Sequence, residues 1–404
     1  MMQAVLMVAG KSTRTYPLTL TRPKPLLPVV NRPLLYHALN QMVGLFDEVV
    51  LITGYRKEMI EAEVGDFYRG MRIVYQEQKE QLGTGHAVLQ AKPHIKGKFV
   101  AMNGDDLFAR VDLQELIKHD DAALVKRAEN PELYGVYQVD ENNRVLNLVE
   151  KPKHYIGDLV NIGCYVLQPD FFEELERTPL SERGEIEITS AILSVARRRP
   201  FLALPINGFW LPTGYAWDLL NHQEFLMAEH EFIIEGQIET GAVLKGKVSV
   251  GKNSVIKAGA YIEGPVVIGE NCTVGPNCYL RAATAIGDNC FIGASVEIKN
   301  SIVISNCRIQ HLSYVGDSVI GAGCNLGAGT LIANHRHDDA TVKSMVKGKP
   351  VDSKRHKLGA ILADGVSTGI HTSIYPGRKL WPGTTTRPGA IVQTDIMPED
   401  ARWE

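Results

Sequence analysis

The first 46 residues of the chain contain no aspartate or glutamate, although the 404-residue sequence carries 46 acidic side chains in all. At average composition a stretch of this length holds roughly five acids. The same stretch holds the basic residues Lys11, Arg14, Arg22, Lys24 and Arg32. This one-sided charge indicates a local field suited to a polyanionic ligand.

Two further absences limit the class of protein. No apolar run is long enough to cross a membrane, and no secretory signal opens the chain. We therefore expect a cytoplasmic protein that neither spans nor binds a membrane. The net charge of only −3 argues against a general affinity for nucleic acid, so any anion site has to be local.

The cysteine pattern excludes a familiar type of metal site. The sequence has six cysteines and no Cys-x-x-Cys pair. A zinc site is therefore not predicted. Because no export signal is present, we expect reduced thiols in a cytosol.

Short β-rich runs alternate with helical patterns from the start of the chain to about Tyr215. The expected strands are Ala4–Val8, Val49–Thr53, Arg72–Tyr75 and Phe99–Asn103. A helix is expected over Arg32–Leu45, with Asn31 as its N-cap. Its predicted buried face consists of Leu34, Leu35, Ala38, Leu39 and Met42. The alternation predicts an α/β domain on a doubly wound, Rossmann-like sheet of parallel or mixed strands.

The second half of the chain follows a six-residue period. Twelve aliphatic residues recur without a miss at Ile238, Leu244, Val250, Ile256, Ile262, Ile268, Val274, Leu280, Ile286, Ile292, Ile298 and Ile304. The phase then slips, and the period resumes at Tyr314, Ile320, Leu326 and Ile332 and again at Leu362, Thr368, Ile374, Leu380, Thr386 and Val392. Such hexapeptide repeats predict a parallel β-helix in which three repeats form one triangular coil.

Two of the cysteines follow the same repeat. Cys272 and Cys290 are separated by three hexapeptides, which is one predicted coil. We interpret them as small buried residues that fill the interior. Their stacking nevertheless leaves a disulfide geometrically open.

Two segments interrupt this organisation. Within Phe209–Glu229, the spacing of Trp217, Leu220, Phe225 and Ala228 predicts a connecting helix, so we place the domains at residues 1–228 and 229–404. Residues 333–357 leave the repeat with seven basic and three acidic side chains. This loop is either a solvated hairpin or a contact for anionic groups or a neighbouring subunit.

Ordered motifs accompany the first half. The turn Ala9-Gly10-Lys11 follows the first strand and can aim backbone N–H groups at phosphates. The sequence AGKSTRTYPLT is followed by RPKPLLPV, NRPLL, QLGTGHA at 81–87, NGDD at 103–106, Glu150-Lys151-Pro152 and Asn161-Ile162-Gly163. In order and spacing this series resembles the sugar-1-phosphate nucleotidylyltransferase family, from the start of the chain to about Tyr215.

The resemblance implies that a sugar 1-phosphate oxygen attacks the α-phosphorus of a nucleoside triphosphate in line, while pyrophosphate leaves. Positioning and charge neutralisation would supply the catalysis, because no protein nucleophile is needed. It assigns the nucleotide to Ala9, Gly10, Lys11, Gln76, Gly83 and Thr84, and the triphosphate to Arg14 and Lys24 as catalytic residues. It assigns the sugar and its phosphate to Gly135, Glu150, Lys151 and Asn161, and Mg²⁺ to Asp105.

Two positions depart from this family. Ser12 stands where glycine is usual, which adds bulk beside the phosphates. Pro212, in Trp210-Leu211-Pro212-Thr213-Gly214, stands where relatives have Asp or Asn as the second metal ligand. Proline has no side-chain oxygen, although Mg²⁺ can be held by one carboxylate together with phosphates and waters.

A basic pair marks the second half. Arg281 and Lys299 are one predicted coil apart, so in a β-helix they stack at about 4.8 Å. Two stacked cations repel each other unless an anion sits between them, which predicts a phosphate site. Alternatively, both side chains simply splay into water.

The motifs QHLSYVGD and NLGAGTLIAN follow this pair. With it they resemble the acetyltransferase half of the bifunctional glucosamine-1-phosphate acetyltransferase/N-acetylglucosamine-1-phosphate uridylyltransferase family, including its archaeal branch. The resemblance implies a left-handed β-helix and a homotrimer with acetyl sites between subunits. It assigns the sugar phosphate to Arg281 and Lys299, substrate positioning to Tyr314 and Asn325, the amino group or acetyl carbonyl to Asn334, and acetyl-CoA to Ala328 and Lys343.

His311 is the predicted general base. A free amine has to lose a proton to become an amide, and histidine titrates near the working pH. A lone histidine in a coil is ordinarily structural, but here the accompanying residues favour the catalytic role. His335 stands where many bacterial relatives have tyrosine, which leaves the contacts to the acetyl donor less defined.

Three functions remain open at this point. The first is a bifunctional enzyme that makes UDP-N-acetylglucosamine, with UTP favoured by QLGTGHA. The second is an acetyltransferase whose nucleotidylyl site is weakened or retuned, for instance to dTTP and glucose 1-phosphate. The third is a non-catalytic regulatory subunit, against which Lys24, Asp105 and His311 argue.

Overall fold

The computed structural model describes residues 2–398, and they divide by their contacts into two compact units. The first unit contains the chain through Lys11, Pro23–Leu26 and Leu34–Pro212. The second contains Ser12–Arg22, Leu27–Pro33 and the chain from Thr213. No helix among the described residues is long and apolar enough to cross a membrane. The domain boundary after residue 228 stays a prediction.

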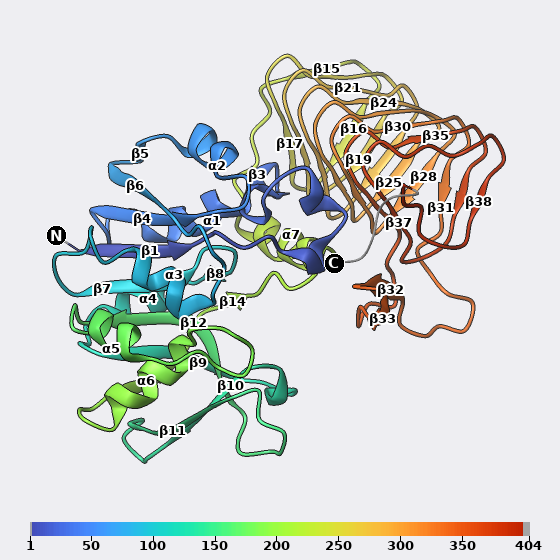
Figure 1. Ribbon diagram of the computed structural model, residues 1–404. Helices are drawn as coiled ribbons and strands as arrows, with labels where there is room; N and C mark the ends of the chain where they lie inside the picture. Colours follow the sequence, from blue (N-terminus) through green and yellow to red (C-terminus); the bar gives the residue numbers. More distant parts are fainter. Residues whose placement is uncertain (1, 399–404) are drawn as a thin grey trace. The chain divides into compact units, whose positions relative to one another are not determined.

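A mixed sheet forms the centre of the first unit (Figure 1), with the strand order β11-β10-β12-β7-β1-β4-β6-β5, β9 beside β12, and β13 beside β9. Its strands are β1 (Gln3–Met7), β4 (Glu48–Thr53), β5 (Phe67–Tyr68), β6 (Met71–Glu77), β7 (Phe99–Asn103), β9 (Ala122–Arg127), β10 (Gly135–Val139), β11 (Val145–Glu150), β12 (Leu159–Leu167) and β13 (Leu202–Pro205). A separate pair joins β8 (Leu107–Phe108) to β14 (Trp210–Leu211). Strand β1 runs parallel to β4 and β7, whereas β12 runs antiparallel to β7.

Helices cover both faces of this sheet. One core packs α1 (Leu34–Met42), α2 (Lys57–Val64) and α4 (Arg110–Leu116) against one face. A second core packs α3 (Thr84–Gln90), α5 (Phe171–Arg177) and α6 (Ile188–Ala196) against the other. Short 3₁₀ turns lie at η3 (Lys24–Leu26) and η4 (Pro131–Leu133). The α/β class expected from the alternating pattern is confirmed.

The predicted elements of this unit form, but the first helix differs from the prediction in its bounds and its N-cap. All four expected strands form, and the predicted face of the first helix is buried. However, the helix is shorter than the predicted Arg32–Leu45, because it ends at Met42. It begins only at Leu34, because Arg32–Pro33 forms β3 and pairs with β2 (Pro28–Val29). Asn31 is not its N-cap: it has a φ of 58°, and its side-chain amide donates to the carbonyl of Ile286 at 2.6 Å.

The second unit contains a left-handed parallel β-helix whose three faces are three parallel sheets (Figure 1). One face contains β15 (Gln237–Ile238), β18 (Val255–Ile256), β21 (Thr273–Val274), β24 (Phe291–Ala294), β27 (Arg308–His311), β30 (Asn325–Leu326) and β35 (Ser367–Thr368). The next contains β16 (Val243–Lys245), β19 (Tyr261–Glu263), β22 (Tyr279–Arg281), β25 (Glu297–Lys299), β28 (Tyr314–Gly316), β31 (Leu331–Ile332), β36 (Ser373–Ile374) and β38 (Ile391–Val392). The last contains β17 (Val248–Val250), β20 (Val266–Ile268), β23 (Thr284–Ile286), β26 (Ile302–Val303), β29 (Val319–Ile320), β34 (Ile361–Leu362) and β37 (Lys379–Leu380).

The six-residue period points into the coil as predicted, except near the phase slip. Ile286 aligns with Val303 rather than Ile304, and it is Val303 that joins the apolar core. The slip therefore occurs between Lys299 and Ile302, in a corner that is a single residue shorter than the corresponding corner of the coil before it. For the same reason Val315 faces the core, and the predicted inward position of Tyr314 is wrong.

Polar residues and thiols complete the corners. Asn253, Asn271, Asn289 and Asn306 all adopt positive φ, which asparagine tolerates better than most residues. Among the described residues the six cysteines are all buried and free. Cys272 Sγ donates to the carbonyl of Gly287 at 3.1 Å. The prediction of buried packing residues is thus confirmed, and the disulfide alternative is wrong.

The predicted connecting helix is α7 (Asp218–Glu229) in the second unit, which also holds η1 (Thr13–Thr15) and η2 (Leu18–Leu20). The predicted helix is thus confirmed, and its buried residues are Leu219, Leu220, His222, Gln223 and Met227. The side-chain amide of Gln223 donates to the carbonyls of Ala283 and Ser301. The basic loop forms the hairpin β32 (Lys343–Val346) and β33 (Lys349–Asp352), which projects from the coils (Figure 1).

The stacked core makes a quantitative prediction. Ile309 is fully buried in it, so Ile309→Ala should lower the unfolding free energy of the coil by about 2–5 kcal/mol. Ile370→Ala, at a side chain that is 51% exposed, should change it by no more than about 0.5 kcal/mol. Denaturant unfolding monitored by far-UV circular dichroism measures both values, and equal effects would contradict the proposed register.

Candidate functional site

The carboxyl ends of β1 and β7 meet at one edge of the first unit's sheet, because these strands pair in parallel. The amide of Gly104 donates to the carbonyl of Met7 at 3.1 Å and holds the turn after β7 against the end of β1. In that turn Asp105 forms an ion pair with Lys24, whose side chain is only 7% exposed. The predicted metal ligand and one predicted triphosphate residue are therefore in contact.

A glycine-lined loop lies beside this edge. Gly83 precedes α3 at a φ of 94°, and a Cβ there would lie 2.8 Å from the Cβ of Glu185, so the position requires glycine. Thr84 begins the helix, while Gly10 is exposed and Lys11 half-buried. The side-chain amide of Gln81 donates to the carbonyl of Ala9 at 2.8 Å and joins this loop to the turn after β1.

Glutamine positions in this region differ from the sequence-based assignment. The side-chain oxygen of Gln76 contacts the imidazole of His94 at 3.0 Å. In contrast, the side-chain amide of Gln78 donates to the carbonyl of Gly83 at 3.2 Å. Gln78 and Gln81 are thus the glutamines that touch the glycine-lined turns. Their closeness to Gly83 along the chain is the signal that could have identified them.

Three predicted sugar residues converge on one point. Gly135 on β10 pairs with Glu150 on β11, and a Cβ at Gly135 would lie 2.9 Å from a Glu150 carboxylate oxygen and 3.5 Å from the Cβ of Asn161. Burial raises the pKa of Glu150, although Arg183 at 3.5 Å opposes this effect. The exposed Lys151 adopts a φ of 45° next to this group.

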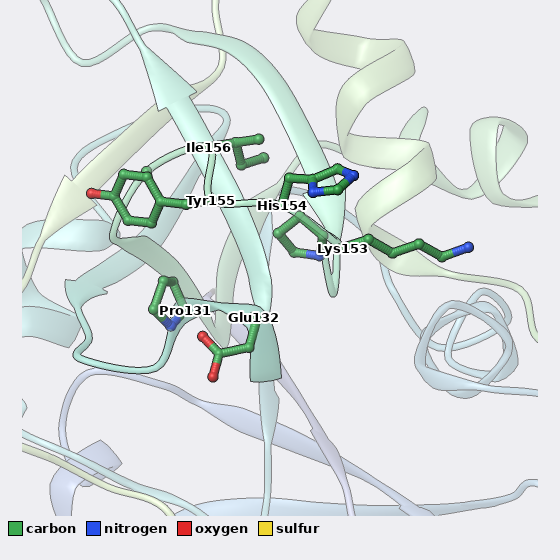
Figure 2. A pocket seen from close by; sticks show the side chains of 8 residues that line it. Pro131, Glu132, Lys153, His154, Tyr155 and Ile156 are labelled. Atoms are coloured by element: carbon green, nitrogen blue, oxygen red, sulfur yellow. The ribbon is translucent and has the colours of Figure 1, made fainter.

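A small cavity of about 240 Å³ lies in the following loop (Figure 2). Its lining residues are Pro131, Glu132, Pro152, Lys153, His154, Tyr155, Ile156 and Gly157. Figure 2 shows the side chain of Lys153 extending away from that of Tyr155. Part of the cavity lining therefore follows Glu150 and Lys151 directly along the chain, but the lining does not gather a cluster of positive charges.

The metal-binding potential of this unit rests on a single aspartate. The carboxylate of Asp106 already accepts from the amide of Asn103 at 3.2 Å and from the indole of Trp210 at 3.4 Å. Pro212 contributes no side-chain ligand. Within residues 2–398, no three His, Cys, Asp or Glu side chains gather as a metal site. Asp105 with substrate phosphates remains the donor set that suits Mg²⁺.

Residues 12–22 group with the second unit by their contacts. Ser12 adopts a φ of 53°, a conformation that favours glycine. This conformation explains why relatives have glycine here, and the serine of this chain adopts it at some cost. Arg14 is exposed, and its guanidinium lies 5.9 Å from the ring centre of Tyr215.

The predicted cationic pair is stacked in the β-helix, where Arg281 and Lys299 occupy the same register on neighbouring strands. Each cation has its own carboxylate: Arg281 lies 2.6 Å from Glu297, and Lys299 lies 3.0 Å from Asp317. The inference that only a bound anion or solvent relieves their repulsion is therefore wrong. The stacking itself is confirmed.

The carboxylate of Asp317 contacts two of the predicted residues directly and is linked to a third through one of them. The carboxylate accepts from Lys299, and also from the side-chain amide of Asn334 at 2.5 Å. The same amide donates to the Tyr314 hydroxyl at 3.1 Å. Burial, followed by the nearby carboxylates, raises the pKa of Tyr314, so its hydroxyl stays protonated at neutral pH. Asp317 lies in the YVGD motif, but nothing in the sequence pattern marks its carboxylate as central.

The neighbouring face carries the remaining acetyl-site candidates. His311 ends β27, is exposed, and within the described part of the chain has no hydrogen-bond partner for its imidazole. Asn325 on β30 pairs with Arg308, which begins the strand that His311 ends. Gly329, which follows Ala328, donates to the carbonyl of His311 at 3.3 Å. These three candidates share one face, whereas Arg281, Lys299 and Tyr314 share the next.

The basic hairpin borders a groove of about 590 Å³. Its lining residues are Ala333, His335, Arg336, His337, Asp338, Val342, Lys343, Tyr375, Pro376, Arg378 and Gln393. Its acid, Asp338, is paired with Arg336, so Lys343 and Arg378 leave a surplus of positive charge. The groove suits a ligand with phosphate groups.

Known proteins resemble the chain along its whole length. The family model described as "Nucleotidyl transferase" matches residues 3–229, and that described as "GMPPB C-terminal domain" matches residues 262–375. The "Bifunctional protein GlmU" of Methanococcus maripaludis (strain C7) is 45% identical, with 98% of this chain and 95% of that protein covered. The "Bifunctional sugar-1-phosphate nucleotidylyltransferase/acetyltransferase" of Sulfurisphaera tokodaii is 37% identical, with 98% of each chain covered.

Solved structures resemble the first part. A UDP-glucose pyrophosphorylase complexed with UDP-glucose superimposes with a TM-score of 0.52 at 25% identity, covering 57% of this chain and 100% of that one. This likeness agrees with the mixed sheet and its two layers of helices.

The two glutamines provide a test of the geometry. Gln78→Ala should raise the nucleotide KM about tenfold, because it removes a side chain in contact with the Gly83 turn. The matched variant Gln76→Ala should change KM less than threefold, since Gln76 is engaged by His94. Steady-state pyrophosphate release measures both, and a larger effect of Gln76→Ala would favour the sequence-based assignment.

Proposed function

From the premise that this chain belongs to the bifunctional GlmU family of nucleotidylyltransferase/acetyltransferases, we propose that it acetylates glucosamine 1-phosphate with acetyl-CoA. It then transfers a uridylyl group from UTP to the resulting N-acetylglucosamine 1-phosphate. The products are UDP-N-acetylglucosamine and pyrophosphate. Both reactions take place in the cytoplasm, where six free thiols persist.

One observation carries the acetyl-transfer half. Lys299 and Asn334 both donate to the buried carboxylate of Asp317, Asn334 also donates to the Tyr314 hydroxyl, and the stacked Arg281 adds a second cation. A phosphorylated amino sugar needs these groups: cations for its phosphate, and a hydroxyl and an amide for its polar edge. Asn325 on the neighbouring face completes the substrate contacts.

His311 acts as the general base. The sugar nitrogen attacks the thioester carbonyl carbon of acetyl-CoA and loses a proton to the imidazole. The tetrahedral adduct then expels the thiolate of coenzyme A. The thiolate takes up the proton from the His311 imidazolium, and an amide bond replaces the thioester. The unpaired imidazole of His311 in the described structure supports this role.

Acetyl-CoA binds the β-helix between the region of His311 and the groove beside the basic hairpin. Ala328 lies one coil from His311, where a small side chain leaves room for the acetyl end. Lys343 and Arg378 line the groove of about 590 Å³ and meet the phosphates of the coenzyme. His335 replaces the aromatic residue of many bacterial relatives and pairs with Asp339.

The nucleotidylyl half relies on positioning. The nucleotide lies against Ala9, Gly10, Lys11, Gly83 and Thr84, and Lys24 neutralises charge on the triphosphate. Gly135, Glu150, Lys151 and Asn161 hold the sugar phosphate. A sugar 1-phosphate oxygen attacks the α-phosphorus in line, and no covalent enzyme intermediate forms.

Magnesium fits this site through one protein ligand. Asp105, together with substrate phosphates and waters, would hold Mg²⁺, which supplies charge neutralisation for the leaving pyrophosphate. Pro212 in place of a second carboxylate favours a weaker metal site. A second candidate function follows from this: the chain transfers acetyl groups efficiently, while its nucleotidylyl site is retuned toward dTTP and other sugar phosphates.

The active assembly is a homotrimer. On one face of the β-helix the first residues of successive strands form a column with Val243, Leu331 and Ile391 exposed. Between them Tyr261 and Tyr279 stack edge to face at 5.6 Å. The same column also holds Glu297, Tyr314 and Ser373. A mixed surface with exposed apolar and aromatic side chains suits contact between copies of the chain.

Replacing the proposed base tests the acetyl half. His311→Ala should lower kcat of acetyl transfer by about 10²–10⁴-fold, which is the usual contribution of a general base. The rate is measured as release of coenzyme A thiol, and pyrophosphate release by the same protein should not change. His119→Ala, a histidine beside Glu115 in the other unit, is the control. An active His311→Ala enzyme would refute the assigned base.

Restoring an acidic ligand tests the nucleotidylyl half. Pro212→Asp should lower the Mg²⁺ concentration for half-maximal pyrophosphate release by about tenfold, because a second carboxylate then binds the ion. Pro205→Asp, at an exposed proline of β13, should leave it unchanged. If Pro212→Asp alters neither the metal dependence nor the preference among triphosphates, the metal-based explanation of a retuned site is wrong.

A further inference from the structure

Asp317 is a buried carboxylate with an unusual number of partners. Its residue is 1% exposed, and its two oxygens accept from Lys299 at 3.0 Å, from Asn300 at 2.8 Å and from Asn334 at 2.5 Å. Arg355 lies 3.8 Å away. A group buried at this depth and bonded on both oxygens cannot reorient without breaking several hydrogen bonds at once.

The carboxylate determines the direction of the Asn334 amide. An ionised carboxylate only accepts hydrogen bonds, so the NH₂ group of Asn334, and not its carbonyl oxygen, has to face Asp317. The second proton of that NH₂ group is directed to the Tyr314 hydroxyl at 3.1 Å. Both donor positions of the amide are therefore engaged, and its Oδ1 atom remains to accept a hydrogen bond.

The same reasoning fixes the Tyr314 hydroxyl. Its oxygen accepts from Asn334, so its own proton is directed elsewhere and is available to an acceptor. Burial raises the pKa of Tyr314, which keeps that proton in place at neutral pH. Next to one another the site thus offers one acceptor, Asn334 Oδ1, and one donor, Tyr314 Oη–H.

The Asp317 oxygen that Lys299 does not contact is held equally firmly. The amide of Asn300 donates both to this oxygen and, at 2.8 Å, to Glu224 of α7. Arg355 at the base of the basic hairpin lies 2.9 Å from the same Glu224. The carboxylate is therefore anchored to the helix and to the hairpin of its own unit, so its direction does not depend on substrate.

We propose that Asp317 is a positioning residue of acetyl transfer, which orients Asn334 to accept an N–H bond from the sugar amine and leaves Tyr314 as a donor. The inference rests on the proposed acetylation of glucosamine 1-phosphate. An amine held through one N–H by Asn334 Oδ1 rotates less, so its lone pair is presented to the thioester while another proton passes to the base. Of the two roles left open for Asn334, orientation of the amine is selected.

Exchanging the two side chains tests this directly. Asp317→Asn lets residue 317 present either an N–H or an oxygen to Asn334, so kcat for thiol release should fall about 10–100-fold while the KM for glucosamine 1-phosphate rises less than kcat falls. Asn334→Asp places two carboxylates face to face, so its kcat for thiol release should fall further than that of Asp317→Asn. The double variant again pairs one amide with one carboxylate, although the amide nitrogen at 317 then also faces Lys299, which donates to the same Asp317 oxygen as Asn334 does. Its kcat should therefore recover in part and exceed that of the worse single variant.

The variants are suited to this comparison because asparagine and aspartate have nearly the same shape and volume. Asp317 adopts a φ of 49°, which asparagine tolerates as well as aspartate does. Pyrophosphate release by the first unit and the thermal unfolding midpoint report integrity in each preparation. Asp288→Asn is the matched control, since Asp288 is an exposed corner carboxylate that accepts only the backbone amide of Glu270 among the described contacts.

The outcomes separate this inference from the function on which it rests. Wild-type protein that releases no thiol with glucosamine 1-phosphate and acetyl-CoA would overturn both. Thiol release by the wild type, combined with single-variant losses that simply multiply in the double variant, would overturn the positioning role alone. An unchanged kcat in Asp317→Asn would do the same. Recovery in the double variant supports the orientation of Asn334 by Asp317.

Discussion

The inward aliphatic ladder of the β-helix is the constraint on which the proposed acetyl-transfer site depends. Each coil consists of three short strands and three corners, and the buried side chains hold successive coils in register. This register stacks the outward side chains of successive coils into columns, in which neighbouring side chains lie about 4.8 Å apart. Arg281 lies beside Lys299 for this reason alone. A site that depends on stacked polar groups needs a core that forbids one coil to slide on the next.

Shortening a corner by a single residue has a local consequence. The missing residue falls between Lys299 and Ile302, and the next corner, which contains Asp317, keeps the shorter length. Here Lys299 pairs with Gly316, whose lack of a side chain leaves room for the Tyr314 hydroxyl and the Asn334 amide. A Cβ at Gly316 would lie 2.6 Å from the Tyr314 hydroxyl oxygen and from the Asn334 amide nitrogen. The slip and the glycine together open space on an otherwise regular face.

Sequence periodicity predicts the coil well because its signal is local. Eleven of the twelve uninterrupted positions face the interior as expected. The error at Ile304 arises because a missing residue shifts the period, and the shift becomes visible in the sequence only in later repeats. The alternating pattern of the first unit is equally informative, since β7 forms with the predicted bounds. Asn31 fails as a cap because a distant carbonyl, that of Ile286, competes for its amide.

Site chemistry is less predictable than fold because it depends on partners that are distant in the chain. The stacking of Arg281 and Lys299 follows from spacing, but their neutralisation by Glu297 and Asp317 does not. Likewise, motif order finds Gly83, but only the folded loop shows that Gln78 contacts it. Motifs identify residue types at intervals, whereas hydrogen-bond direction and charge pairing are properties of the assembled surface.

The two stacked cations are consequently not equivalent. Glu297, the partner of Arg281, has a side chain that is 34% exposed, whereas the Asp317 side chain, which partners Lys299, is 2% exposed. An incoming phosphate can draw Arg281 away from Glu297, because water then solvates the released carboxylate. It cannot draw Lys299 away at similar cost, because Asp317 would remain as a buried charge with one partner fewer. In the proposed site, Arg281 would therefore follow the phosphate, while Lys299 would stay in place and define where the phosphate comes to rest.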